Sequence, residues 1–150
     1  MVRNFEREIE KLIRRSKVCV LGSVDVNGYP NSKAMFRPRK VLGVKTFYLP
    51  TSIKSEHVAQ IASNPRTSLY FYKRWFGFKG VLLVGNAEII TDTDVKEMLW
   101  DKKDLKLFAG GVADPDYCVL KFTCTSGRIF NKRDSQNFVV EGDKARSLDF

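Results

Sequence analysis

Residues 18–36 read VCVLGSVDVNGYPNSKAMF, and this stretch indicates the fold because two apolar runs flank a turn signal. Asn27-Gly28 is typical of a β-hairpin turn, since both residue types tolerate the positive φ angles that such turns need. The hairpin places Lys33 within its return strand, among small and apolar neighbours. A cation in that position raises the question of an anionic ligand.

Further strands are expected after this hairpin. They are TFYLP at 46–50, TSLYFY at 67–72, GVLLVGNAEII at 80–90 and YCVLKFTCTSGRIF at 117–130. In the last run, apolar residues at 118, 120, 122 and 124 alternate with 119, 121 and 123, the period of a strand with one buried face. The cysteines in this run, Cys118 and Cys124, are therefore interpreted as small core residues.

Three helices are expected beside these strands. The first follows a possible cap at Asn4, and its basic residues at 3, 7, 11 and 14 alternate with acids, which favours a solvated face. The second begins near Ser55 or Glu56, with Val58, Ile61 and Ala62 pointing inward, and ends at Asn64-Pro65. The third is TDTDVKEMLW at 91–100.

This pattern predicts a mainly β protein with peripheral helices. Six or so short antiparallel strands with hairpin links favour a β-barrel, and an open α+β sheet is the alternative. The length of 150 residues fits a single domain over 1–150. We expect residues from about 137 to 150 to form a flexible tail.

Composition limits the classes of function. The formal net charge of +9 favours anionic partners without choosing among phosphate esters, nucleic acid and acidic lipid. Nucleic acid is disfavoured because basic and aromatic residues form no single recognition motif. No apolar run spans a membrane, and the charged N-terminus is unlike a signal peptide, so a cytoplasmic location is expected. One histidine and three cysteines without a CxxC pair predict no metal centre.

The segment TSIKSEH at 51–57 has the composition of an anion site. Hydroxyl groups and a lysine lead into a helix whose first backbone N–H groups carry a partial positive charge. From this segment alone, an ordinary capped helix with a polar entry loop is the favoured interpretation. Lys33 favours the anion site, because we expect its strand to run beside the strand that ends at Pro50.

Other signals are less specific. Trp75, Phe76 and Phe78 follow Lys73 and Arg74, which indicates a loop that stacks on a flat ring, or else a lid or dimer contact. The sequence has no Ser/His/Asp arrangement and no glycine-rich nucleotide fingerprint, so no catalytic residue is assigned.

Together these segments resemble a known family. GYPNSKAMF at 28–36, FYLPTSIKSEHVAQIASNPRTSLYFY at 47–72, GVLLVGNAEIITD at 80–92 and DPDYCVLKFT at 114–123 resemble the pyridoxamine 5'-phosphate oxidase-like superfamily of FMN-binding split barrels. The likeness is greatest to its short bacterial members, of the general-stress and oxidase-related type. It implies a six-stranded, Greek-key-like antiparallel split β-barrel that forms a homodimer with FMN at the subunit interface.

The resemblance also implies which residues bind the flavin. A basic strand residue and its neighbours would line it, a Thr/Ser pair and a phosphate loop would hold its phosphate, and the partner subunit would approach its ring. These roles carry over in turn to Lys33, Ala34 and Met35, to Thr51 and Ser52, to Lys54, Ser55, Glu56 and His57, and to Lys79 and Gly80.

Two departures from the family pattern bear on function. Relatives usually carry Lys or Arg at the positions of Glu56 and His57, and we expect Lys54 to compensate for the acid. Authentic pyridoxamine phosphate oxidases continue into a substrate-binding segment with Arg and His, whereas this sequence ends in EGDKARSLDF. The resemblance thus predicts an FMN-binding oxidoreductase that is not an authentic vitamin B6 oxidase, with its substrate unknown. The alternative is a non-catalytic protein that binds or senses flavin, haem or deazaflavin, with His57 as the haem ligand to test.

Overall fold

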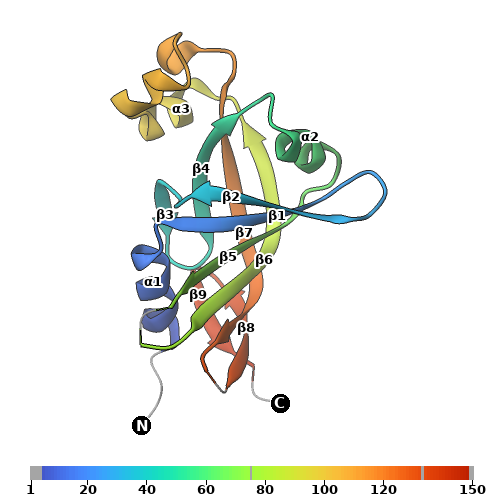
Figure 1. The fold of residues 1–150 in the computed structure, drawn as a ribbon, viewed down its shortest axis with the longest axis vertical. Coiled ribbons are helices and arrows are strands. Elements are labelled where there is room, and N and C mark those ends of the chain that lie inside the picture. The colour runs from blue at the N-terminus through green and yellow to red at the C-terminus, as the bar shows by residue number, and fades with distance from the viewer. Residues whose placement is uncertain (1–4, 75, 133, 149–150) are drawn as a thin grey trace.

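The computed structural model describes residues 5–74, 76–132 and 134–148, which form a curved β-sheet with helices around it (Figure 1). The expected cap Asn4 and the aromatic Trp75 lie outside these residues. In chain order the elements are α1 Phe5–Arg15, β1 Val18–Val24, β2 Pro30–Phe36, β3 Lys40–Leu42, β4 Thr46–Ser52, α2 Glu56–Ser63, β5 Arg66–Lys73, β6 Lys79–Ile90, α3 Thr93–Leu99, the 3-10 helices η1 Lys102–Lys106 and η2 Gly111–Ala113, β7 Tyr117–Phe130, β8 Ser135–Glu141 and β9 Lys144–Ser147.

The described strands form one antiparallel sheet in the order β2-β1-β5-β6-β7-β4-β3, and β8 and β9 extend it from β7. The described residues form nine strands where six or so were predicted, because β3, β8 and β9 carry little alternating pattern of their own. The backbone pairing of the described residues leaves β2 and β3 as two free ends. The mainly β antiparallel architecture is confirmed, whereas closure of a barrel is not shown.

The β1–β2 hairpin has a different turn from the one that its Asn-Gly pair predicts. Val24 pairs with Pro30, so five residues form the loop, and the Asp25 carboxylate accepts hydrogen bonds from the N–H groups of Asn27 and Tyr29, both at 2.9 Å. A turn at 27–28 alone would place Lys33 opposite Gly22. The observed register places it opposite the buried Leu21, on the face of the sheet that meets the core.

β7 changes its buried face part of the way along. Val84 pairs with Ser126 but Gly85 pairs with Cys124, which leaves Thr125 as an extra residue in a β-bulge. Before the bulge the even positions from 118 to 124 are buried, and after it the odd position of Ile129 is buried. The predicted alternation therefore holds over 118–124, and Cys118 and Cys124 are core residues.

The core forms where this sheet curves around aromatic side chains. Phe47 lies with its ring centroid 6.2 Å from that of Phe71 and 5.8 Å from that of Phe122. α1 covers one side of this core through its buried apolar residues Ile9, Leu12 and Ile13. Its basic residues at 7, 11 and 14 are exposed, as the charge pattern predicts.

A second, smaller core lies under α3, η1 and η2 at the top of Figure 1. Tyr117 and Val119 lie on the face of β7 opposite to Cys118 and Leu120, which are in the main core. Both faces are buried at this end of the strand because these helices cover the outer one. Arg39 connects the sheet to these helices. Its guanidinium donates two hydrogen bonds to Asp104, at 2.5 and 3.0 Å, and one to the Leu99 carbonyl at 2.7 Å.

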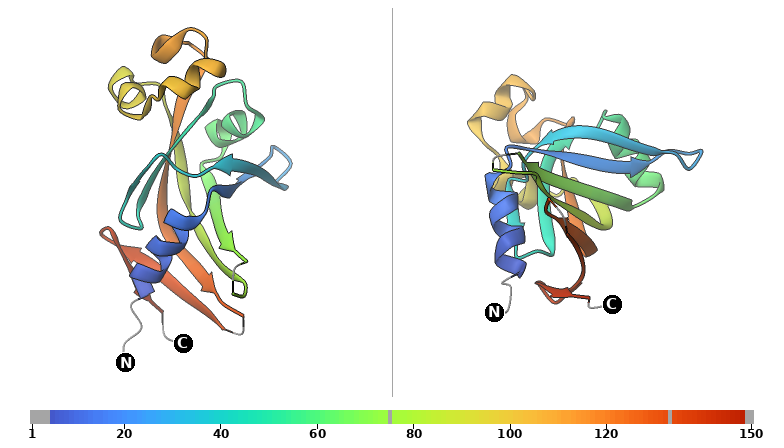
Figure 2. Two further views of the ribbon diagram at one scale, coloured as in Figure 1. Left: turned by 60° about the vertical axis from the view of Figure 1, so that its left-hand side comes forward. Right: turned by 60° about the horizontal axis from the view of Figure 1, so that its bottom comes forward.

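The segment predicted to be a tail from about residue 137 contains a hairpin over its described residues, formed by β8 and β9. β8 pairs with β7 and β9 pairs with β8, and the side chain of Phe138 is fully buried. Figure 2 shows this hairpin beside α1. The sequence signal was missed because these short strands depend on pairing with β7. No helix among the described residues is long and apolar enough to cross a membrane.

Candidate functional site

The loop between β4 and α2 lies within the segment 51–57, which the sequence predicts as an anion site. The Ser55 N–H donates to the Ser52 carbonyl at 3.0 Å, and the Lys54 N–H donates to the Ser52 hydroxyl at 3.2 Å, so the chain turns sharply into the helix. Ser55 is the N-cap residue, yet its hydroxyl makes no capping hydrogen bond. The Val58 N–H donates to the Ser55 carbonyl at 3.1 Å. The N–H groups of Glu56 and His57 precede it and have no carbonyl of the helix to bond to, so they carry the partial positive charge of a helix N-terminus.

Thr51 and His57 form a buried pair behind this loop. Thr51 Oγ1 lies 2.9 Å from His57 Nε2, and the two residues are only 8% and 5% exposed. Burial lowers the pKa of His57, and the nearby charge of Lys33 lowers it further. At neutral pH His57 is therefore an uncharged side chain, unlike the Lys or Arg expected from the family at this position.

Lys33 reaches this region by a route that the sequence did not predict. β2 pairs with β1, whereas β4, the strand that contains Pro50, pairs with β7 and β3. β2 and β4 are therefore not neighbouring strands in the described sheet, contrary to the prediction. Instead, α2 packs against β1, where the Ser23 hydroxyl donates to Gln60 Oε1 at 2.5 Å. The hairpin register then turns Lys33 toward the same side, and its charge acts on His57.

The neighbours of Lys33 divide between two faces of β2. Met35 lies opposite Cys19 and packs against the main core, on the same face as Lys33. Ala34 lies opposite Val20 on the other face. Of the three β2 residues predicted to line a flavin, only Lys33 and Met35 therefore share a face.

Lys54, which is predicted to compensate for Glu56, forms an ion pair with a different acid in this chain. Its ammonium lies 3.1 Å from the Asp116 carboxylate, which precedes β7. Both side chains are solvent accessible, so the pair adds little stability, but it directs the lysine toward another acid. Glu56 is exposed in the first turn of α2, where it complements the helix dipole and repels a phosphate. Asp116 was missed because no sequence pattern links it to Lys54.

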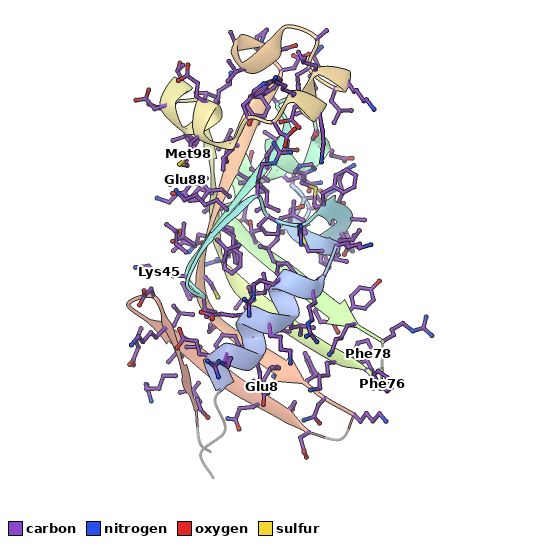
Figure 3. The ribbon with its side chains drawn as sticks, turned by 90° about the vertical axis from the view of Figure 1, so that its left-hand side faces the viewer. Glu8, Lys45, Phe76, Phe78, Glu88 and Met98 are labelled. Carbon is purple, nitrogen blue, oxygen red and sulfur yellow. The ribbon has the colours of Figure 1, made fainter. Side chains whose placement is uncertain are left out.

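Lys79 and Gly80 lie far from α2 within this chain. They begin β6, paired with Lys73 and Tyr72, near the end of the molecule where Figure 3 labels Phe76 and Phe78. Figure 1 shows the start of β6 and α2 at opposite ends of the sheet. The structure of one chain thus gathers Lys33, Thr51, Ser52, Ser55, Glu56 and His57, and separates them from Lys79 and Gly80.

Two pockets lined by described residues lie away from the loop before α2. One of about 370 Å³ separates α1 from the 37–43 segment, with Arg14, Arg37 and Arg39 on its walls. The other, of about 400 Å³, is an open depression lined by residues 76–79 together with 131, 132 and 134, and it includes Lys79. Neither of these two pockets includes a residue of the 51–57 loop.

The sequence and the fold are similar to those of known proteins. The family described as pyridoxamine 5'-phosphate oxidase matches residues 5–131. Among solved structures, a protein from Clostridium acetobutylicum, related to general stress protein 26 of B. subtilis, is 34% identical. That match covers 95% of this chain and 99% of the other, with a TM-score of 0.84. None of the curated proteins compared matches this chain.

Two more distant structures share the fold. A pyridoxamine 5'-phosphate oxidase-related, FMN binding protein from Nostoc punctiforme is 13% identical, with a TM-score of 0.74 and coverage of 99% of both chains. A heme binding protein from Mycobacterium smegmatis is 18% identical, with a TM-score of 0.72, and the match covers 93% of this chain and 60% of that one. At these identities the likeness concerns the fold alone.

Proposed function

Because the chain belongs to the pyridoxamine 5'-phosphate oxidase family, we propose that it binds FMN and serves as a flavin-dependent oxidoreductase. The observation that carries this proposal is the convergence of Lys33, the Thr51–His57 pair and the N-terminus of α2. The related Nostoc protein is described as FMN binding. Bound flavin supplies electron or hydride transfer, and the protein supplies anchoring and electrostatics.

The residues at this loop fit a phosphate ester. Phosphate oxygens accept hydrogen bonds from helix N-terminal N–H groups and from hydroxyls, and they attract a nearby ammonium. Ser52 and Ser55 offer hydroxyls beside α2, and Lys33 offers the ammonium. The free side chain of the N-cap Ser55 is consistent with this role, because its hydroxyl is not used to cap the helix.

A homodimer would complete the site. The sheet face opposite the main core exposes large apolar groups, among them Phe36, which is 84% exposed, and the stacked rings of Tyr72 and Phe78. Such a face fits a contact with a second copy of this chain. In a two-fold dimer, Lys79 and Gly80 of one chain would meet the flavin ring at the other chain's α2, and Lys79 would stabilise negative charge on the reduced ring.

A non-catalytic binding protein for flavin, haem or deazaflavin is the second candidate. The Mycobacterium smegmatis protein, described as heme binding, shares the fold. For this chain haem is disfavoured, because the single histidine is buried and its Nε2 already lies 2.9 Å from Thr51 Oγ1. A deazaflavin with a phosphate would use the same anchoring groups as FMN.

Equilibrium titration with FMN and with riboflavin tests the proposal, since the two differ only in the phosphate. We expect FMN to bind at least about 10-fold more tightly, because a phosphate with several charge-assisted hydrogen bonds contributes more than about 1.4 kcal/mol. Equal affinities, or no binding of FMN, would overturn the phosphate site.

Two further measurements separate binding from turnover and monomer from dimer. Anaerobic reduction of the FMN complex by nicotinamide cofactors, followed by reoxidation with candidate acceptors, distinguishes an oxidoreductase from a carrier. Light scattering with and without FMN gives the oligomeric state. A monomeric FMN complex would exclude a site shared between subunits.

A further inference from the structure

His57 has a hydrogen bond whose direction the heavy atoms leave open. The imidazole Nε2 and the Thr51 Oγ1 are 2.9 Å apart, and either can be the donor. A neutral imidazole with its proton on Nδ1 accepts the hydroxyl proton at Nε2, whereas an imidazolium must donate from Nε2 to Oγ1. In the second case the hydroxyl proton of Thr51 is free to point at another acceptor.

We propose that His57 is a positioning residue that couples phosphate binding to the uptake of one proton. In the free protein, Thr51 donates to the neutral imidazole. When a phosphate dianion arrives, a proton from solvent adds to Nε2 of His57, which then donates to Thr51 Oγ1. The Thr51 hydroxyl proton turns to the phosphate. This inference rests on the proposed phosphate site and adds its regulation by pH.

The groups around His57 determine whether its imidazole is neutral or protonated. Burial and the charge of Lys33 on β2 lower its pKa in the free protein. β1 carries no charged side chain, and Glu88 on β6 pairs with Lys121 at 3.7 Å. Beside the helix N-terminus, Lys54 pairs with Asp116 at 3.1 Å and Glu56 is exposed.

A phosphate dianion adjacent to these groups changes the direction in which the pKa of His57 is shifted. Its two negative charges oppose both the burial of His57 and the single charge of Lys33, so binding raises the pKa of His57. By linkage, the complex then takes up a proton wherever the free imidazole is neutral and the bound one is charged. The proton adds a favourable charge that a Lys or Arg would otherwise supply at this position.

The chain offers a direct assay because His57 is its only histidine. One imidazole signal in the proton and ¹⁵N NMR spectra therefore reports its protonation in the unmodified protein. At about pH 7.5 we expect the neutral signal in the free protein and the imidazolium signal in the FMN complex. An imidazole that stays neutral in a saturated FMN complex would overturn the proposal.

Calorimetry measures the same proton by a second route. The apparent binding enthalpy in two buffers of different ionisation enthalpy gives the number of protons taken up. At about pH 7.5 a phosphate monoester is already a dianion, since its second pKa is about 6, so it contributes little itself. We expect roughly one proton per FMN for the wild type. Zero uptake contradicts the coupling.

His57→Gln is the matched control, because its amide can still donate to Thr51 but cannot be protonated. We expect this variant to bind FMN without proton uptake, and with less pH dependence than the wild type. Proton uptake that persists in His57→Gln would assign the proton to another group. Thermal melting checks that the variant is folded, and the wild-type NMR measurement remains decisive if it is not.

The assay also separates failure of this inference from failure of the proposed function. If FMN does not bind the wild type, the flavin proposal fails by the titration alone. NMR with inorganic phosphate at tens of millimolar, about pH 7.5, then still tests the coupling. A rise in the His57 pKa with phosphate supports it, and an unchanged pKa refutes it.

Discussion

Replacement of Lys33 by alanine tests the central residue of the proposed site. Lys33 is exposed and, among the described residues, no ion pair holds its ammonium. An exposed position of this kind contributes within about 0.5 kcal/mol to folding. A unit charge near a phosphate charge contributes between about 1 kcal/mol in water and about 4 kcal/mol at an effective dielectric constant of 20, for a separation of about 4 Å.

Because Lys33 is solvent accessible, the lower part of this range applies. We expect Lys33→Ala to weaken FMN binding by about 1–2 kcal/mol, roughly 5- to 30-fold in Kd, with little change in the melting temperature of the free protein. The loss should diminish as salt is added, since ions screen an exposed pair. Flavin fluorescence or absorbance titration measures the Kd at two ionic strengths.

Lys102→Ala is the matched control for Lys33→Ala. It removes the same charge from an exposed lysine on η1, which belongs neither to β2 nor to the 51–57 loop, so it changes the net charge without removing a residue of the proposed site. The reasoning is refuted if the two variants bind FMN equally well. A fall in the melting temperature of free Lys33→Ala with unaltered FMN affinity would make Lys33 a structural residue.

Three further predictions concern stability and reactivity. Burial raises the pKa of Asp104, but the hydrogen bonds from Arg39 and the Asp101 N–H outweigh it and hold this pKa below its usual range. Asp104→Asn should therefore cost about 1–3 kcal/mol at neutral pH. Its deficit in denaturant unfolding should begin to shrink below about pH 4, where the unfolded chain takes up a proton, and should vanish as pH falls through the lowered pKa of the folded wild-type carboxylate. Gly85→Ala should cost about 1–3 kcal/mol in the same assay, because its Cβ would lie 1.9 Å from the Thr123 carbonyl oxygen; a melting temperature like that of the wild type contradicts this close approach. Burial raises the pKa of each cysteine thiol to about 11 or 12, so a thiol reagent at neutral pH should label none in the native protein and all three after unfolding; rapid native labelling would show that a thiol is accessible.

The local elements were predictable because their signals are contained in short segments. The bounds of β7 and the start and end of α2 follow from alternation, from the polar entry loop and from Asn64-Pro65. Val58 and Ile61 are buried as the helical period predicts, whereas Ala62 is exposed and His57 is buried in its place. The helical period alone does not determine which neighbouring residue of a short helix faces the core.

Register and pairing were decided by tertiary structure. The loop of the first hairpin includes five residues because the Asp25 carboxylate accepts two backbone N–H groups, a preference that Asn27-Gly28 does not reveal. The bulge at Thr125 shifts the buried face of β7, and the tail becomes a hairpin only because β7 offers it an edge. Each result depends on partners distant in sequence.

The sequence by itself determined which chemistry is available: a lysine on the return strand, hydroxyls before a helix and a single histidine. These residue types follow from composition and local pattern. Only the tertiary structure decided what each one does, because pairing, burial and electrostatics depend on neighbours far along the chain. It turned Lys33 to the core face beside α2, paired Lys54 with Asp116, and buried His57 against Thr51, where its charge state depends on its surroundings.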